Sequence, residues 1–168
     1  GAASGRMTVI GRKAVLPDDL PALIRFMGHL HDLEHAIDPA RQTAADGADP
    51  HMRYQILDAQ QNDGLVALAE TQGGLPVGMM VCSVETFPGE YLYPSESRVG
   101  YINDLWIEPE HRGGTVLDDM IAMAEAHFKA LGLKILMLSY LVGNDRAGAA
   151  YAKRGFRPNE VQMKREIS

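Results

Sequence analysis

The order of secondary-structure signals in this 168-residue sequence predicts a single α/β domain with a central mixed β-sheet flanked by helices. Three observations lead to this prediction. Residues 101–156 read as strand, glycine-containing loop, amphipathic helix, strand, short helix and Gly-Phe turn. Residues 75–85 are almost continuously apolar, as expected of a strand buried on both faces. Residues 20–33 carry apolar side chains at helical spacing, which indicates a helix packed on the sheet.

The N-terminal half is predicted to contain one strand and two helices. A short strand is expected over residues 8–16, and the Pro17-Asp18-Asp19 cluster opens the first helix. Residues 37–50 are rich in Asp, Ala, Gly and Pro, so we expect a mobile connection there. The second helix is expected over residues 51–61. We expect residues 1–7 to be a disordered tail or tag remnant that precedes a domain over residues 8–168.

Strand and helix signals alternate through the rest of the chain. Gln72-Gly73-Gly74 is a hairpin signal between two strands, and residues 87–97 contain too many turn residues for regular structure. Thr115 followed by Asp118 is typical of a capping box at a helix start. The expected elements are strands over 65–71, 75–85, 98–107 and 135–141, helices over about 115–132 and 145–154, and a closing strand over 161–167.

Composition excludes several functional classes. The formal net charge of −6 argues against nucleic acid as the main partner, because phosphate binding needs clustered Lys and Arg, but it suits a cationic amine substrate. The single cysteine, Cys82, lies in an apolar run, so no disulfide framework can form and a buried thiol is expected. No apolar run has the length of a membrane span. We therefore expect a cytoplasmic protein that binds neither nucleic acid nor membrane.

Polar side chains gather at the end of the first predicted helix. His31, Glu34 and His35 match the H-x-x-E-H pattern of inverted zinc proteases, with two imidazoles on one helical face. No later motif supplies a third ligand, so a solvated or substrate-facing surface is favoured and no metal is expected. Tyr91 and Tyr93, with acidic neighbours on the same loop, could hold an ammonium group by cation–π contacts.

Two sequence features of the C-terminal half resemble the Gcn5-related N-acetyltransferase (GNAT) superfamily. One is the family pattern N-x-x-A-x-x-x-Y-x-x-x-G-F, which is matched throughout by Asn144, Ala147, Tyr151, Gly155 and Phe156. The other is the segment LWIEPEHRGG, which resembles the usual lead-in to the loop [Q/R]-x-x-G-x-[G/A] that binds acetyl-CoA. The resemblance implies a GNAT-like fold and an acetyl-CoA-dependent N-acetyltransferase.

The loop itself departs from the family pattern. With Arg112 in the first slot, the two glycine slots hold Thr115 and Leu117, whereas the glycines of this chain are Gly113 and Gly114. A register that starts at His111 aligns Gly114 but leaves Val116 in the last slot. The first register is preferred, because it alone gives the following helix the spacing of small and apolar residues that the family shows.

The resemblance also implies roles for individual residues. Tyr151 occupies the position of the general acid for the CoA thiolate, and Asn144 that of a residue which hydrogen-bonds the pantetheine or the loop. The thioester would lie beside the strand that ends at Trp106 and Ile107. The cradle for the pyrophosphate would consist of Arg112, Gly113, Gly114, Thr115 and Val116.

The sequence defines the catalytic base and the acceptor substrate less well. Asp104 lies near the position where several family members carry a Glu that deprotonates the amine, and Glu108, beyond the end of the strand, is the alternative. Ser139 replaces a Glu that some protein-acetylating relatives carry, which favours a small or medium amine. His31, His35, Tyr91 and Tyr93 are candidates for substrate binding. A homodimer is compatible with the sequence.

Three functions therefore stay open at this point. The preferred one is acetyl transfer from acetyl-CoA to a primary amine by direct attack in a ternary complex. The second is a catalytically degenerate CoA-binding or regulatory module, because Thr115 and Leu117 replace the small residues of the loop. The third is a metal-dependent hydrolase that uses His31, Glu34 and His35.

Overall fold

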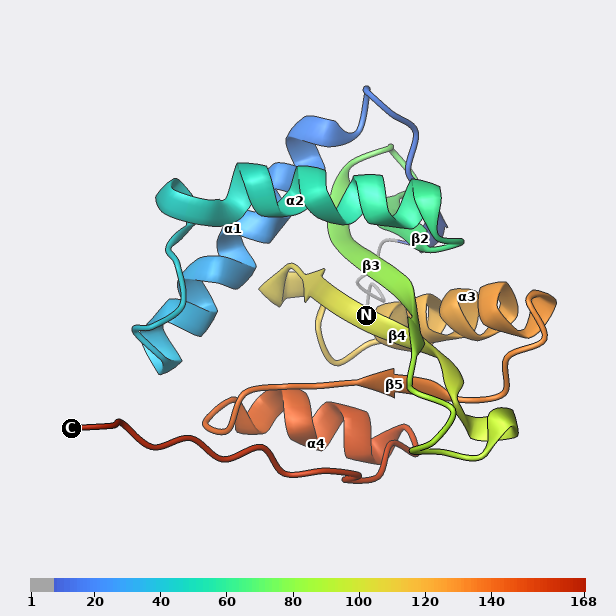
Figure 1. Cartoon of the computed structure of the whole chain (residues 1–168). Helices are drawn as coiled ribbons and strands as arrows, with labels where there is room; N and C mark the ends of the chain where they lie inside the picture. Colours follow the sequence, from blue (N-terminus) through green and yellow to red (C-terminus); the bar gives the residue numbers. More distant parts are fainter. Residues whose placement is uncertain (1–7) are drawn as a thin grey trace.

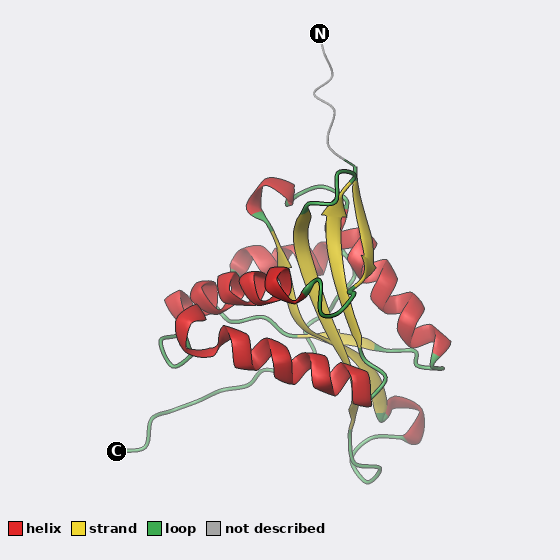
Figure 2. Ribbon diagram, turned by 90° about the horizontal axis from the view of Figure 1, so that it is seen from above, coloured by secondary structure: helices red, strands yellow, loops and turns green. Residues whose placement is uncertain are grey.

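The computed structural model describes residues 8–168, and the expected tail over residues 1–7 lies outside this part of the chain. Five strands form one sheet in the order β1-β2-β3-β4-β5, and helices lie on both of its faces (Figures 1 and 2). The elements are β1 (Val9–Lys13), α1 (Leu20–Ile37), α2 (Ala44–Gln61), β2 (Leu65–Thr71), β3 (Pro76–Thr86), η1 (Pro94–Glu96), β4 (Arg98–Ile107), η2 (Pro109–His111), α3 (Val116–Ala130), β5 (Leu136–Leu138) and α4 (Asp145–Lys153).

The sheet is mixed, as the sequence predicts. Strands β1 to β4 pair antiparallel with their neighbours, whereas β4 and β5 pair in parallel. Strands β2, β3 and β4 follow the predicted strands closely. Strand β5 is shorter than expected, because its pairing with β4 covers only Leu136 to Leu138.

A β-bulge in β4 determines which of its side chains face which helices. Ile102 lies opposite Cys82 and Asp104 lies opposite Val81, so Asn103 is an extra residue between the two pairs. Ile102 therefore packs in the cluster under α3, whereas Asp104 faces α2, although the two residues are two positions apart. Without the bulge, the alternation of a strand would place both on one face.

Two apolar clusters cover the two faces of the sheet. The first lies between the sheet and α3 and includes Met80, Met120 and Phe128. The second lies between the sheet and helices α1 and α2 and includes Leu23, Phe26 and Met79. The helical face predicted from periodicity over residues 20–33 packs in the second cluster, and Cys82 is buried in the first cluster as expected.

The prediction of a mobile connection over residues 37–50 is wrong for its second half. Helix α2 begins at Ala44, because the side chain of Thr43 caps it by accepting a hydrogen bond from the amide of Asp46. Gly28 of α1 leaves room for this helix, since a Cβ there would lie 3.2 Å from the Cβ of Ala44. Pro50 is accommodated inside the helix.

Two other local predictions are also wrong. Thr115 precedes α3 in a helical backbone conformation and makes no side-chain capping bond, so no capping box forms. Residues 161–167 form no strand and are exposed, because this segment runs back past α4 instead of along a strand (Figure 1). Lys164 Nζ contacts Asp38 Oδ2 at the end of α1, at 2.9 Å.

Truncation of Phe26 tests the importance of the α1 layer. Phe26 is fully buried, so we expect Phe26→Ala to lower the free energy of unfolding by about 3–5 kcal/mol. Leu57→Ala on α2 is the control, because Leu57 is 52% exposed and its loss should change stability little. Urea denaturation of the three proteins measures both effects. Equal losses in the two variants would contradict the burial described above.

Candidate functional site

A cleft opens where β4 and β5 separate. Their pairing ends at Ile102 and Leu138, although β4 continues to Ile107. A cavity of about 410 Å³ occupies the gap and extends to the loop before α3 and along one face of α4. The predicted site residues among its lining are Trp106, Ile107, Arg112, Gly113, Gly114, Asn144 and Tyr151.

The loop at one end of the cleft is shaped by Arg112 and Gly113. The Nε–H group of Arg112 donates to the carbonyl oxygen of Ile107 at 2.7 Å, and its guanidinium lies 4.6 Å from the centre of the Trp106 ring. Gly113 has a φ of +79°, which an L side chain rarely adopts. The loop thus turns tightly from the end of β4 to the start of α3, where unpaired backbone N–H groups favour anions.

Two of the predicted cradle residues lie elsewhere. Thr115 and Val116 are not among the lining residues, and Val116 packs in the core beneath α3. Leu117 does line the cleft, although the family pattern has a small residue in its slot. Because α3 begins at Val116, the Val116 side chain points into the core and the Leu117 side chain points toward the cavity.

The cleft is cationic, in contrast to the chain as a whole. Among the described residues that line the cleft, Glu34 is the one carboxylate. Burial lowers the pKa of Arg112, and the nearby Arg146 adds to the effect. Such a concentration of positive charge in a concave site attracts an anionic ligand. The cationic lining residues are Arg112, Arg146, Lys153 and Arg154.

Asn144 and Tyr151 bring α4 to the cleft. Asn144 precedes the helix, and its side-chain oxygen accepts a hydrogen bond from the amide of Ala147 at 3.4 Å. The oxygen of this amide therefore caps the helix, which leaves its NH₂ group as the donor to a ligand in the cleft. Tyr151 packs edge-on against Phe156, with ring centres 6.1 Å apart. Burial, and secondarily the charge of Glu34, raises the pKa of Tyr151, so its hydroxyl is protonated at neutral pH.

Asp104 lies on the face of β4 that is covered by α1 and α2. It shares this face with Trp106, as strand alternation predicts, and it is 7% exposed. Its carboxylate accepts a hydrogen bond from Gln55 Nε2 at 3.0 Å. Its pKa is raised to about 7, mainly by burial and secondarily by repulsion from Glu34, whereas the hydrogen bond from Gln55 acts in the opposite direction. The alternative base, Glu108, is 3.5 Å from His29 Nδ1.

A chain of hydrogen bonds leads from Asp104 to the surface through three side chains of α1 and α2. Gln55 Nε2 is 3.2 Å from His51 Nε2, and His51 Nδ1 is 2.7 Å from His31 Nε2. His31 Nδ1 in turn lies 3.1 Å from the carbonyl oxygen of Gln42. Burial lowers the pKa of His51, and His31 contributes to the same effect.

The H-x-x-E-H residues do not converge on a metal site. His31 is part of the chain described above, whereas His35 lies 2.6 Å from the carbonyl oxygen of Arg41 and Glu34 contacts the side chain of Arg41. Within residues 8–168, no group of three His, Cys, Asp or Glu side chains is placed to hold a metal ion. Tyr91 and Tyr93 are strongly exposed and do not line the cleft.

Sequence reasoning missed Glu34 as a cleft residue and Gln55 and His51 as partners of Asp104. The spacing of His51 and Gln55, four positions apart, does place both on one face of α2. Nothing in the sequence indicates that this face meets Asp104, which lies 49 positions later than Gln55. No helix in the described residues is long and apolar enough to cross a membrane.

Comparison with known proteins agrees with this arrangement. The model of the acetyltransferase (GNAT) family matches residues 30–156. No curated protein sequence matches this chain. Among solved structures, a mutant of the BH1408 protein from Bacillus halodurans has a TM-score of 0.78 and 19% identity, covering 95% of this chain and 99% of that one.

Two further structures share the fold. A GCN5-related N-acetyltransferase from Ralstonia eutropha has a TM-score of 0.73 and 22% identity, covering 95% of this chain and 99% of that one. A predicted acetyltransferase from Clostridium acetobutylicum, solved with acetyl-CoA, has a TM-score of 0.71 and 19% identity, covering 95% of this chain and 96% of that one. Because the family model spans more than half of the residues, the chain belongs to the acetyltransferase (GNAT) family.

Proposed function

We propose that this protein transfers the acetyl group of acetyl-CoA to the primary amine of a small or medium substrate, by direct attack in a ternary complex. The observation that supports this most strongly is the cationic cleft between β4 and β5, which carries Tyr151 on one wall and Glu34 near it. Family membership and the neighbour solved with acetyl-CoA support the choice of donor.

The phosphates of acetyl-CoA would bind at the loop between β4 and α3. Arg112 and Arg146 provide positive charge there, and Gly113 and Gly114 allow the backbone to approach the ligand closely. Backbone N–H groups at the start of α3, including those of Thr115 and Val116, add donors whose side chains need not face the cleft. The Asn144 NH₂ group would donate to the pantetheine arm.

The reaction would begin with an ammonium group attracted to Glu34. Asp104 is buried and does not line the cleft, so it would take a proton from this group through a water molecule, and a base with a pKa near the working pH suits this step. The free amine forms a bond to the thioester carbonyl carbon, and the C–S bond breaks when the tetrahedral intermediate collapses. Tyr151 would donate its proton to the leaving thiolate. It would regain a proton from the nitrogen of the intermediate, which must lose a second proton to become the amide, so the net proton released is the one that Asp104 holds.

Thiol release in the presence of candidate amines tests this function. We expect Tyr151→Phe to lower kcat about 100-fold while the affinity for acetyl-CoA changes little, because only the departing thiolate needs the proton. Tyr54→Phe is the control, since Tyr54 is an exposed residue of α2. Equal turnover in the Tyr151 variant and the wild type would contradict the role of Tyr151.

Acetyl-CoA binding, measured beside thiol release, separates the enzyme from the catalytically degenerate module. Leu117 in the cleft favours weaker binding of CoA, because a small residue in its slot leaves more room for the loop. Saturable binding of acetyl-CoA without thiol release for polyamines, aminoglycosides and amino acids would favour a module that binds CoA without turnover.

Asp104→Asn tests the ionisation of the proposed base without an activity assay. An aspartate with a raised pKa binds a proton more tightly in the folded than in the unfolded state, so its contribution to stability falls as the pH rises. Between pH 4 and pH 8, we expect the wild type to lose about 4 kcal/mol of unfolding free energy relative to Asp104→Asn. Parallel stability curves would show that Asp104 titrates normally.

A further inference from the structure

While both histidines are neutral, the hydrogen bonds between Asp104 and Gln42 can form in only one direction. The carbonyl oxygen of Gln42 accepts, so the Nδ1 atom of His31 must carry a hydrogen. In a neutral His31, Nε2 then accepts from the Nδ1–H group of His51. The Nε2 atom of His51 must therefore accept from the NH₂ group of Gln55.

This direction fixes the orientation of the Gln55 amide. Its NH₂ group has two hydrogens, one for His51 and the other for the carboxylate of Asp104. We propose that Gln55 and His51 are positioning residues for Asp104, and that His31 fixes the direction of their hydrogen bonds so that the amide favours the ionised carboxylate. The inference rests on the proposed function only in treating this carboxylate as the base.

Protonation of the histidines would reverse the arrangement. A charged His51 carries a hydrogen on Nε2, which would face the NH₂ group of Gln55 with two donors in contact. The amide must then turn its oxygen toward His51 and toward Asp104, and this oxygen can accept a hydrogen bond from a protonated carboxyl group. Asp104 therefore loses its proton more readily while both histidines are neutral.

Few other charged groups act on this carboxylate. The charge of Glu34 on α1 acts on it, and its own charge acts on the Cys82 thiol of β3. Burial, followed by the charge of Asp104, raises the pKa of this thiol, so it stays neutral in the working range. His51 Nε2 itself is 3.9 Å from Asp104 Oδ2. The pKa of the base is therefore set mainly by its burial, by Glu34 and by the hydrogen bond from Gln55, and the histidine pair acts on it through the Gln55 amide.

The pH dependence of kcat/KM tests this proposal. Gln55→Met keeps the length of the side chain but removes its hydrogen bonds, so the pKa of Asp104 should rise and the acidic limb should move up by about one pH unit. Gln60→Met, at an exposed position of the same helix, should leave the limb unchanged. An unchanged limb in Gln55→Met would overturn the proposal.

An NMR measurement keeps this test independent of activity. Long-range proton–nitrogen spectra of the wild type at pH 7.5 should show His31 and His51 as neutral Nδ1–H tautomers. An Nε2–H tautomer at either residue would overturn the proposed direction. If the protein shows the expected tautomers but acetylates no amine, the proposed function is wrong and the chain of hydrogen bonds still holds.

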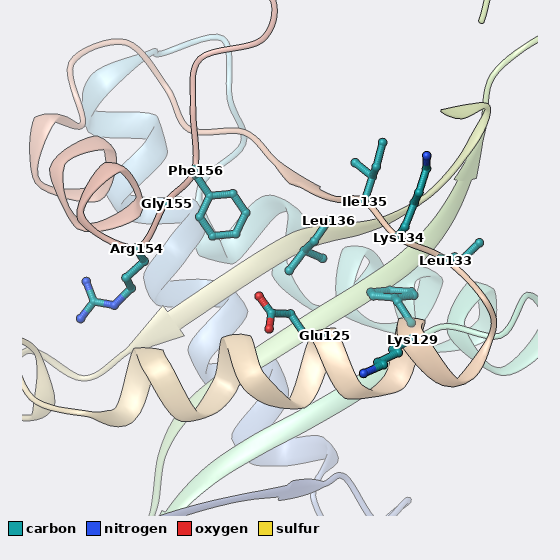
Figure 3. A pocket seen from close by; sticks show the side chains of 10 residues that line it. Glu125, Lys129, Leu133, Lys134, Ile135, Leu136, Arg154, Gly155 and Phe156 are labelled. Carbon is teal, nitrogen blue, oxygen red and sulfur yellow. The ribbon is translucent and has the colours of Figure 1, made fainter. Parts of the chain in front are cut away.

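A second cavity, of about 480 Å³, lies between α3, β5 and the end of α4 (Figure 3), and none of the residues in the chain of hydrogen bonds from Asp104 to Gln42 lines it.

Discussion

The bulge at Asn103 is the constraint on which the site depends. It reverses the alternation of β4 at the position where the pairing with β5 ends, so Asp104 and Trp106 face α1 and α2 while Leu105 and Ile107 face α3. Beyond this point the two strands separate, and the cleft occupies the gap. One extra residue in a strand thus places the proposed base on the face that α1 and α2 cover, two positions from Trp106, which lines the cleft.

Electrostatics divides the cleft into two ends. Arg112 and Arg146 concentrate positive charge near the loop, in a chain whose formal net charge is −6. Glu34 supplies the negative charge near Tyr151 and Asp104, and it raises the pKa of both. This distribution suits an anionic donor at one end and a cationic acceptor at the other. It also keeps the phenol protonated while the buried carboxylate titrates near neutral pH.

Local patterns predicted most of the fold, and contacts between distant residues account for the rest. The periodicity of α1, the continuous apolar run of β3 and the turn between β2 and β3 are local signals, and each predicted its element. The start of α2 was missed because composition indicated a loop, whereas the Thr43 cap and the contact with Gly28 stabilise a helix. The bulge, the Gln55–Asp104 bond and the exposed C-terminal segment depend on register and topology, which no local pattern encodes.

The central claim is that the cleft between β4 and β5 binds acetyl-CoA, and calorimetric titration of the protein at neutral pH tests it most directly. The account predicts saturable binding at one site per chain, with an affinity that falls as salt is added, because arginines at the loop meet the phosphates. Absence of saturable binding would contradict the assignment of the cleft and leave only the fold.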